Sequence, residues 1–108
     1  MRIMRLIVMF DLPTGSKAER KSYADFRKFL VKDGYTMEQF SVYTRVLFTR
    51  EAAQTHIARL QSNLPKAGMV TVFQLTEKQY ADRLRLLDTR PSSSSPPEEE
   101  GAQLTLAL

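Results

Sequence analysis

The chain begins with an almost unbroken apolar run from Ile3 to Phe10. A run of about eight apolar residues has the length of a strand buried in a sheet. Thr14-Gly15 then breaks the strand, and Ser16-Lys17-Ala18-Glu19 fits a capping box, in which the serine and the glutamate satisfy two backbone donors at a helix start. The pattern therefore predicts a strand and then a helix to about Lys32, where Asp33-Gly34 supplies a stop signal.

The predicted helix has an apolar side and a basic side. At about 100° per residue, the apolar side is formed by Tyr23, Phe26, Phe29 and Leu30. Six cations share the other side: Lys17, Arg20, Lys21, Arg27, Lys28 and Lys32. The one acid near them is Asp25, whereas ordinary surface helices interleave both signs. Both a solvated face and a phosphate-binding face are consistent with this pattern.

The segment 35–48 is rich in aromatic and β-branched residues, which is typical of strands. Its 14 residues exceed the usual strand length, so we expect a turn or bulge near Glu38 to Ser41. Thr49 can cap a second helix from about Arg50 to Asn63. The spacing predicts that its buried face consists of Ala53, Ile57, Leu60 and Leu64.

The last part of the chain changes character twice. Met69–Leu75 has the composition of another strand, and Thr76 with Glu77 begins a short polar segment of one or two helical turns. The stretch 89–102, rich in Ser, Pro and Glu, has the composition of a flexible linker. Residues 103–108 alternate again as a strand, which we expect to dock on a sheet edge across a dimer, with disorder as the alternative.

The order strand, helix, two strands, helix, strand predicts an α+β fold. Specifically, it predicts a ferredoxin-like β-α-β-β-α-β sandwich with an additional C-terminal strand. In this fold, two helices cover one face of a four-stranded antiparallel sheet. The expected organisation is a domain over residues 1–88, the linker 89–102 and the docking strand 103–108.

Composition and charge narrow the possible functions. The chain has 108 residues and no cysteine, which excludes a disulfide scaffold, a thiol nucleophile and a thiolate metal site. Its first apolar run is too short to span a bilayer and has no signal-peptide cleavage site, so we expect a cytoplasmic protein without membrane partners. The formal net charge is +4, but three of the 12 acidic residues are Glu98, Glu99 and Glu100. Up to Arg90, the chain has 16 basic and nine acidic residues. This excess favours a polyanionic partner.

Few side chains are candidates for chemistry. Asp11 directly follows the first apolar run, at an edge where sheets often carry functional sites. Taken alone, it is as well explained as a cap or turn residue of the following helix. His56 is the single histidine and has no acid at a helical spacing suited to a proton relay, so we interpret it as structural. Ser41 is either an ordinary strand serine or a phosphate contact.

Several motifs together resemble the small CRISPR adaptation subunit, the family of CRISPR-associated endoribonucleases or endonucleases. They are Phe10-Asp11-Leu12-Pro13 at the strand end, Arg20 with Phe26-Arg27-Lys28-Phe29-Leu30 in the helix, Gln39-Phe40-Ser41-Val42-Tyr43, and Thr76-Glu77-Lys78-Gln79-Tyr80, as in type II systems. The similarity covers roughly residues 2 to 87. Phe10 departs from the pattern, because many relatives have a tyrosine before the aspartate.

The resemblance implies a homodimer in which Asp11 and its copy hold a divalent ion, usually Mg²⁺, between them. It also implies binding of duplex DNA (the protospacer), with single-stranded RNA as a further ligand, and association with the larger CRISPR integrase subunit. Lys17, Arg20, Lys21, Arg27, Lys28 and Ser41 are the expected nucleic-acid contacts, and Asp11 is the expected catalytic and metal-binding residue.

Two functions are compatible with this resemblance. The first is a metal-dependent endonuclease that hydrolyses RNA or DNA phosphodiesters. The second is a structural bridge in spacer acquisition that holds duplex DNA without cutting it. A third alternative, an RNA-recognition module, shares the fold but needs a glycine-containing aromatic signature on its third strand, which this sequence lacks.

Overall fold

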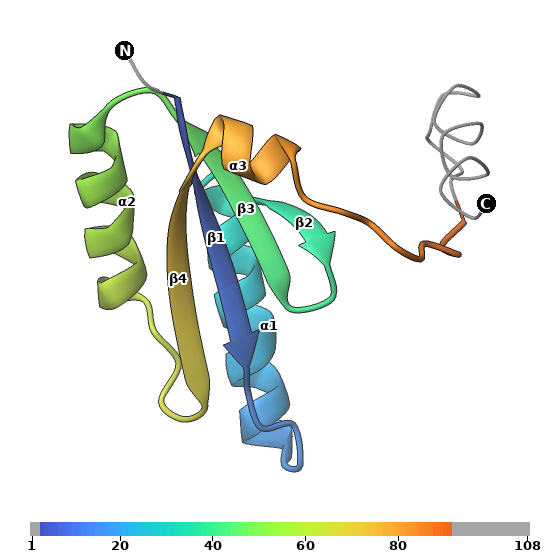
Figure 1. Cartoon of the computed structure of the whole chain (residues 1–108). Coiled ribbons are helices and arrows are strands. Elements are labelled where there is room, and N and C mark those ends of the chain that lie inside the picture. The colour runs from blue at the N-terminus through green and yellow to red at the C-terminus, as the bar shows by residue number, and fades with distance from the viewer. Residues whose placement is uncertain (1–2, 92–108) are drawn as a thin grey trace.

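The computed structural model describes residues 3–91, which form an α+β fold (Figure 1). Its elements are β1 (Met4–Asp11), α1 (Lys17–Lys32), β2 (Thr36–Gln39), β3 (Val42–Leu47), α2 (Arg50–Ser62), β4 (Met69–Thr76) and α3 (Glu77–Ala81). The order β-α-β-β-α-β confirms the predicted ferredoxin-like sandwich. Apart from residues 89–91, the predicted linker 89–102 and the predicted strand 103–108 lie outside the described residues.

The sheet has the order β2-β3-β1-β4, and every neighbouring pair is antiparallel. The central strand β1 pairs with β4 along its whole length, from Met4 opposite Thr76 to Asp11 opposite Met69. Asp11 is therefore the last residue of β1. This is the strand end that its position after the apolar run indicated.

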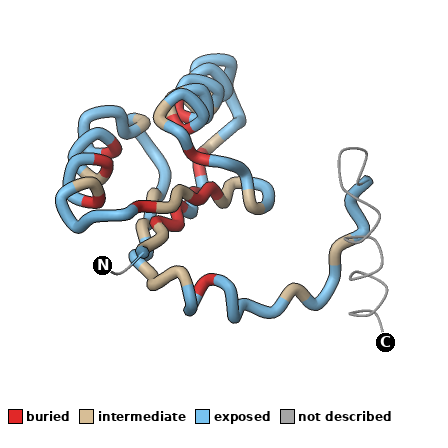
Figure 2. Tube along the Cα trace, turned by 90° about the horizontal axis from the view of Figure 1, so that it is seen from above, coloured by how far each residue is buried: buried red, intermediate tan, exposed pale blue. Residues whose placement is uncertain are grey.

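Within residues 3–91, α1 and α2 cover one face of the sheet, and the opposite face is left without such a layer (Figure 2). The buried core lies between the helices and β1, which contributes Leu6, Val8 and Phe10 to it. On the helical side it is completed by residues such as Leu30 and Leu60, which are 0% and 2% exposed. Each fully buried side chain of this size contributes about 1.5–3 kcal/mol to folding.

Local capping signals set the helix bounds much as the sequence predicted. The Ser16 side chain accepts from the Glu19 backbone N–H, and the Glu19 carboxylate accepts from the Ser16 N–H, so the capping box is present. Thr49 caps α2 in the same way through the Ala52 N–H. The prediction for the buried face of α2 was wrong at one position, because Leu64 lies beyond the end of the helix and is 49% exposed.

The segment 35–48 is divided at Phe40 and Ser41, which confirms the expected break. Ser41 has φ +63, the left-handed conformation that one residue of a tight hairpin needs. Its carbonyl accepts a hydrogen bond of 3.1 Å from the Phe10 N–H, which joins the turn to the end of β1.

The chain after β4, including α3, turns onto the face of the sheet opposite α1 and α2. Thr76 caps α3, and the following residues approach the sheet close to Ile7, Val42 and Leu75. Within residues 3–91, no helix has both the length and the apolar character needed to cross a membrane.

Candidate functional site

Asp11 ends β1 with its side chain exposed, on the face of the sheet that the helices leave open. None of the salt bridges within residues 3–91 uses its carboxylate. It does not cap α1, because Ser16 occupies the N-cap position. The cap role that sequence reasoning left open for Asp11 is therefore filled by another residue, and its carboxylate remains available for a ligand.

The backbone of Asp11 is held by a close approach from the loop before β4. Gly68 has φ +107, and a Cβ atom at this position would lie 2.6 Å from the Asp11 carbonyl oxygen. A side chain cannot be accommodated at this distance, so glycine is required here for both its conformation and its size.

Phe10 points to the opposite face and forms the centre of an aromatic cluster. Its ring lies 5.2 Å from that of Phe26, 5.7 Å from that of Tyr23 and 5.8 Å from that of Tyr43, measured between centroids. Edge-to-face pairs such as Phe10 with Phe26 add about 0.5–1.5 kcal/mol beyond the burial itself. The rigid cluster fixes the strand end that presents Asp11.

Ser41 lies beside this cluster, where its hydroxyl is 3.1 Å from the Tyr23 hydroxyl. The side chain is therefore engaged within the chain, in a contact between α1 and the β2–β3 turn. Its predicted contact with phosphate stays a prediction.

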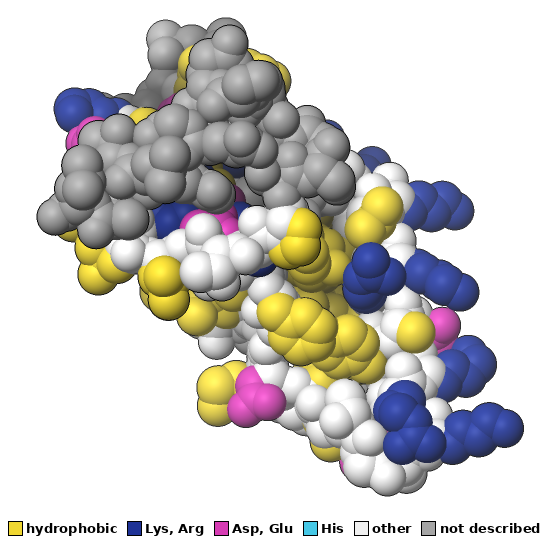
Figure 3. Space-filling model, turned by 90° about the vertical axis from the view of Figure 1, so that its right-hand side faces the viewer, with side chains coloured by type: hydrophobic (Ala, Val, Ile, Leu, Met, Phe, Trp, Pro, Cys, Tyr) yellow, Lys and Arg dark blue, Asp and Glu magenta, His cyan; other side chains and the backbone are white. Residues whose placement is uncertain are grey.

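The predicted cations of α1 are all exposed and form a row along one margin of the molecule (Figure 3). Lys21 forms a salt bridge of 2.8 Å with Asp25, so its charge is compensated. Arg20 and Arg27 donate instead to neutral acceptors, the Thr14 carbonyl at 3.2 Å and the Tyr43 hydroxyl at 3.0 Å. The three remaining cations, Lys17, Lys28 and Lys32, take part in no salt bridge within residues 3–91.

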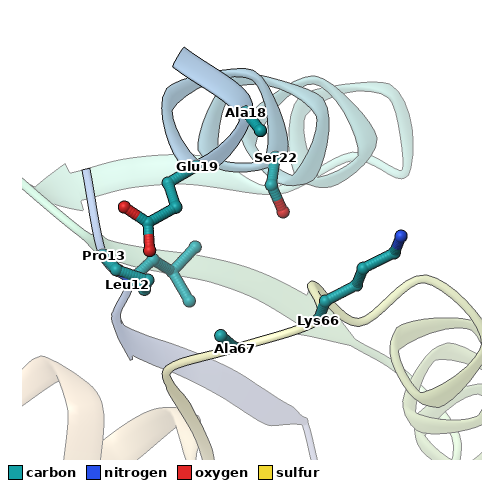
Figure 4. A pocket seen from close by; sticks show the side chains of 7 residues that line it. All are labelled: Leu12, Pro13, Ala18, Glu19, Ser22, Lys66 and Ala67. Carbon is teal, nitrogen blue, oxygen red and sulfur yellow. The ribbon is translucent and has the colours of Figure 1, made fainter. Parts of the chain in front are cut away.

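A small hollow lies between the start of α1, the chain after Asp11 and the loop before β4 (Figure 4). It is lined by Leu12, Pro13, Ala18, Glu19, Ser22, Lys66 and Ala67. The Glu19 carboxylate is already committed to the Ser16 N–H at 2.9 Å, and the remaining lining is largely apolar. The hollow therefore adds no second carboxylate to Asp11.

The face of the sheet that carries Asp11 is otherwise apolar. Met9, Met69 and Phe73 are 43%, 68% and 47% exposed on it, around the nearly buried Ile7. Exposed apolar side chains that gather on one sheet face indicate a surface for association.

His56 is buried and has an acidic partner, which the spacing of acids along its own helix did not indicate. Its Nδ1 lies 2.8 Å from a carboxylate oxygen of Asp33, and the other oxygen accepts from Arg59 at 2.8 Å. Burial alone would raise the pKa of Asp33, but these hydrogen bonds hold it below its usual value. Helical spacing around His56 does not indicate Asp33, because Asp33 caps the end of another helix, α1. The cluster links α1 to α2 and supports the structural role predicted for His56.

A second cluster, also missed from the sequence, fastens α3 to β2. Glu38 accepts hydrogen bonds from Tyr80, Arg83 and Arg85, and although burial opposes it, these bonds lower the pKa of the carboxyl group. The Tyr80 ring lies between two guanidinium groups, 4.0 Å from that of Arg5 and 3.9 Å from that of Arg83. Every group in this cluster has a partner within it, which is typical of a cluster that stabilises the fold.

Within residues 3–91, no group of three or more His, Asp or Glu side chains is arranged to hold a metal ion. The exposed Asp11 carboxylate is a suitable oxygen donor for Mg²⁺, but one carboxylate is a weak site. A divalent ion at Asp11 would therefore need ligands beyond those that residues 3–91 of one chain place beside it.

Comparison with known proteins adds an independent line of argument. Residues 4–83 match the family model described as CRISPR associated protein Cas2. The chain is 56% identical over 78 residues to the CRISPR-associated endoribonuclease Cas2 of Acidovorax ebreus, covering 72% of this chain and 76% of the relative. It is 48% identical over 90 residues to the protein of that name from Streptococcus mutans, covering 83% of each chain. It is 37% identical over 99 residues to the protein of that name from Flavobacterium psychrophilum, covering 92% of this chain and 86% of the relative.

Proposed function

The chain belongs to the Cas2 family of CRISPR-associated proteins, and from this premise we propose that it is a homodimeric, Mg²⁺-dependent endonuclease that also holds nucleic acid for spacer acquisition. The observation that carries the proposal is the exposed Asp11 on the apolar, open face of the sheet. The curated relatives that the chain matches are named endoribonucleases, which supports hydrolysis of a phosphodiester.

The proposed dimer forms through the open face of the sheet. Met9, Met69 and Phe73 surround the strand end there, and their burial against the same residues of a second copy would stabilise association. A two-fold interface uses the same patch on both subunits, so it brings each residue near the axis close to its own copy. Asp11 lies at the end of this patch, which lets two carboxylates approach one another.

Two Asp11 carboxylates, a phosphate oxygen and water together form an ordinary Mg²⁺ site. When bound, the ion polarises the phosphodiester and makes a coordinated water more acidic. The chain's own contribution is positional: Gly68 holds the Asp11 backbone, and the aromatic cluster around Phe10 fixes the strand end.

The test of the nuclease is Asp11→Asn, which removes the charge and keeps the shape of the side chain. We expect cleavage of labelled RNA and DNA to fall by more than about 100-fold. This is more than is usually lost when a residue that only hydrogen-bonds to a metal ligand is replaced. Dimerisation and duplex binding should persist. Glu51→Gln, at an exposed acid in the first turn of α2, is the control and should cleave normally. Unchanged cleavage by Asp11→Asn would assign the activity to another residue.

A second candidate function is a bridge that holds duplex DNA beside the larger integrase subunit without cutting it. The observation that favours it is the basic face of α1, where three lysines take part in no salt bridge within the described part of the chain. This function needs the cations of α1 but not the Asp11 charge, so the two functions can be separated by mutation.

The bridge is tested by replacing Lys17, Lys28 and Lys32 together with Gln. Each phosphate contact contributes about 0.9 to the slope of log K against log salt. We therefore expect the slope for duplex DNA to fall by about 2 to 3 if all three lysines contact phosphates. Arg50→Gln with Lys78→Gln removes exposed cations from α2 and α3 and serves as the control. An unchanged slope in the triple variant would exclude these three lysines from the interface.

A further inference from the structure

The most exposed aromatic side chain within residues 3–91 is Phe40, at the tip of the β2–β3 turn. It is 79% exposed, although turn positions normally carry small or polar residues. Its ring stacks on that of Tyr23 from α1, with 6.1 Å between centroids and 22° between planes. One side of the Phe40 ring is therefore supported, and the residue as a whole is open to solvent.

The Phe40–Tyr23 pair is mounted rigidly. The Tyr23 hydroxyl is 3.1 Å from the Ser41 hydroxyl, and the Ser41 carbonyl accepts from the Phe10 N–H at 3.1 Å. Tyr23 also lies edge-on against Phe10, at 5.7 Å and 61°. The turn, the helix and the end of β1 thus hold the two rings together before any ligand arrives, which lowers the ordering cost of binding.

Two cations of α1 flank this pair. Arg20 precedes Tyr23 by three residues and Arg27 follows it by four, which are the spacings of neighbours on a helix surface. Their guanidinium groups are oriented by neutral acceptors and keep their positive charge. Figure 3 shows exposed hydrophobic side chains directly beside the row of Lys and Arg.

An exposed aromatic ring beside uncompensated guanidinium groups matches the chemistry of a nucleotide, with a flat base and an anionic phosphate. A hydrophobic protein partner is a poorer fit, because it would have to approach these two charges. The open apolar face around Met9 and Phe73 is a separate surface, since Phe10 and Tyr23 lie on the helical side of β1.

We propose that Phe40, supported by Tyr23, is a stacking platform for an unpaired nucleobase, and that Arg20 and Arg27 contact its neighbouring phosphates. The inference rests on the proposed nucleic-acid function and deepens it, because it selects a junction between duplex and single strand as the bound form. Bases inside a duplex are already stacked on both faces and cannot use the platform. The backbone of Ser41, next to Phe40, is hydrogen-bonded to Phe10, and Asp11 directly follows Phe10, so the platform lies near the strand end that carries the carboxylate.

The first test compares Phe40→Leu with wild type on three labelled ligands: a blunt duplex, the same duplex with a thymidine overhang, and a single-stranded RNA. Stacking of one base on an aromatic residue corresponds to about a 5- to 100-fold change in affinity. We expect a loss in this range for the overhang and single strand, and no change for the blunt duplex. The nucleic acid, DNA or RNA, for which the affinity falls more is identified as the natural ligand of the platform. Phe48→Leu, at another exposed phenylalanine (56%), is the control and should bind all ligands like wild type.

The second test uses fluorescence to measure the stacking of a base on the side chain at position 40. The chain has no tryptophan, so Phe40→Trp introduces a single indole whose fluorescence a stacked base should quench. We expect quenching by the overhang duplex and none by the blunt duplex, whereas Phe48→Trp should respond to neither.

The outcomes separate this inference from the function on which it rests. Equal affinity of wild type and Phe40→Leu for the overhang, while both bind the blunt duplex, overturns the platform alone. A loss that follows a change in oligomeric state, measured by sedimentation, also overturns it by assigning Phe40 to association. Failure of wild type to bind any of the three ligands overturns both proposals.

Discussion

At the scale of single residues, the site depends on a position without a side chain. Gly68 has φ +107 and faces the Asp11 carbonyl, where an added Cβ would also lie 3.0 Å from the Leu12 Cα. Backbone atoms on both sides leave little room for adjustment. A methyl group here must displace the strand end that presents the carboxylate.

We therefore predict that Gly68→Ala lowers the free energy of unfolding by about 1–3 kcal/mol, through strain in the left-handed region and backbone displacement. Cleavage should fall as well, although Asp11 itself is unchanged. Gly15→Ala is the matched control, because its Cβ would meet only a Glu19 carboxylate oxygen at 3.4 Å, an ordinary contact. Urea unfolding and a cleavage assay measure the two effects. A Gly68→Ala protein with normal stability and activity would show that the strand end adjusts freely.

Individual residues also show what sequence could and could not predict. The position of Asp11 at a strand end was visible, because a buried strand leaves a run of apolar residues before it. The role of Gly68 was not visible, since it depends on two segments far apart in the chain. Phe40 was also missed as an exposed residue, because an aromatic residue in a β-rich segment is normally assigned to the core.

At the scale of elements, local sequence signals indicate where the helices begin. They do not indicate which residues of different helices contact one another. The capping boxes at Ser16 and Thr76 operate within four residues, so the sequence indicates both helix starts. The hydrogen bond of His56 with Asp33 joins α2 to the end of α1. Its members are 23 residues apart, and no periodic pattern connects them.

The contact of Asp33, at the end of α1, with His56 and Arg59 of α2 makes the free energy of unfolding depend on pH. The folded-state pKa of Asp33 is lowered by His56 and Arg59, although burial opposes the shift. A lowered carboxyl pKa stabilises the fold at pH values above the unfolded pKa of about 3.9. This contribution is lost as the pH falls through the folded-state pKa. The contact is therefore fully present at neutral pH and weakens only in acid.

We predict that Asp33→Asn costs about 1.5–3 kcal/mol at pH 7, the range for hydrogen bonds to a charged group. The difference from wild type should shrink in acid, as Asp33 of the wild type becomes protonated. Urea unfolding at both pH values measures this. Asp25→Asn, which removes an exposed carboxylate paired with Lys21, should leave stability unchanged at either pH. A pH-independent loss for Asp33→Asn would mean that packing, not charge, makes the contact.

At the scale of the whole molecule, residues 3–91 leave two apolar surfaces exposed. The open sheet face carries Met9, Met69 and Phe73, and the segment after α3 exposes Leu84, Leu86 and Leu87 at about four-fifths of their area. Glu38 fastens the start of this segment to β2. The sequence predicted the sheet and its helical cover, but periodicity alone does not reveal which exposed face meets a second copy.

The dimer proposal makes a last prediction about Phe73. Phe73→Glu places a charge on the open face, where burial against a second copy would leave it unpaired at a cost of several kcal/mol. We expect sedimentation velocity to show a monomer with a normal fold. Cleavage should be lost although Asp11 is intact, because one carboxylate alone is a weak Mg²⁺ site.

Gln74→Glu provides the matched control for this prediction. It introduces the same charge one position along β4, at an exposed residue that alternation places on the other side of the sheet. This variant should remain dimeric and active. If Phe73→Glu is monomeric and still cleaves, then a single Asp11 suffices and the paired-carboxylate site is wrong. If it stays dimeric, the open face is not the interface, and the second Asp11 has to be sought across another surface.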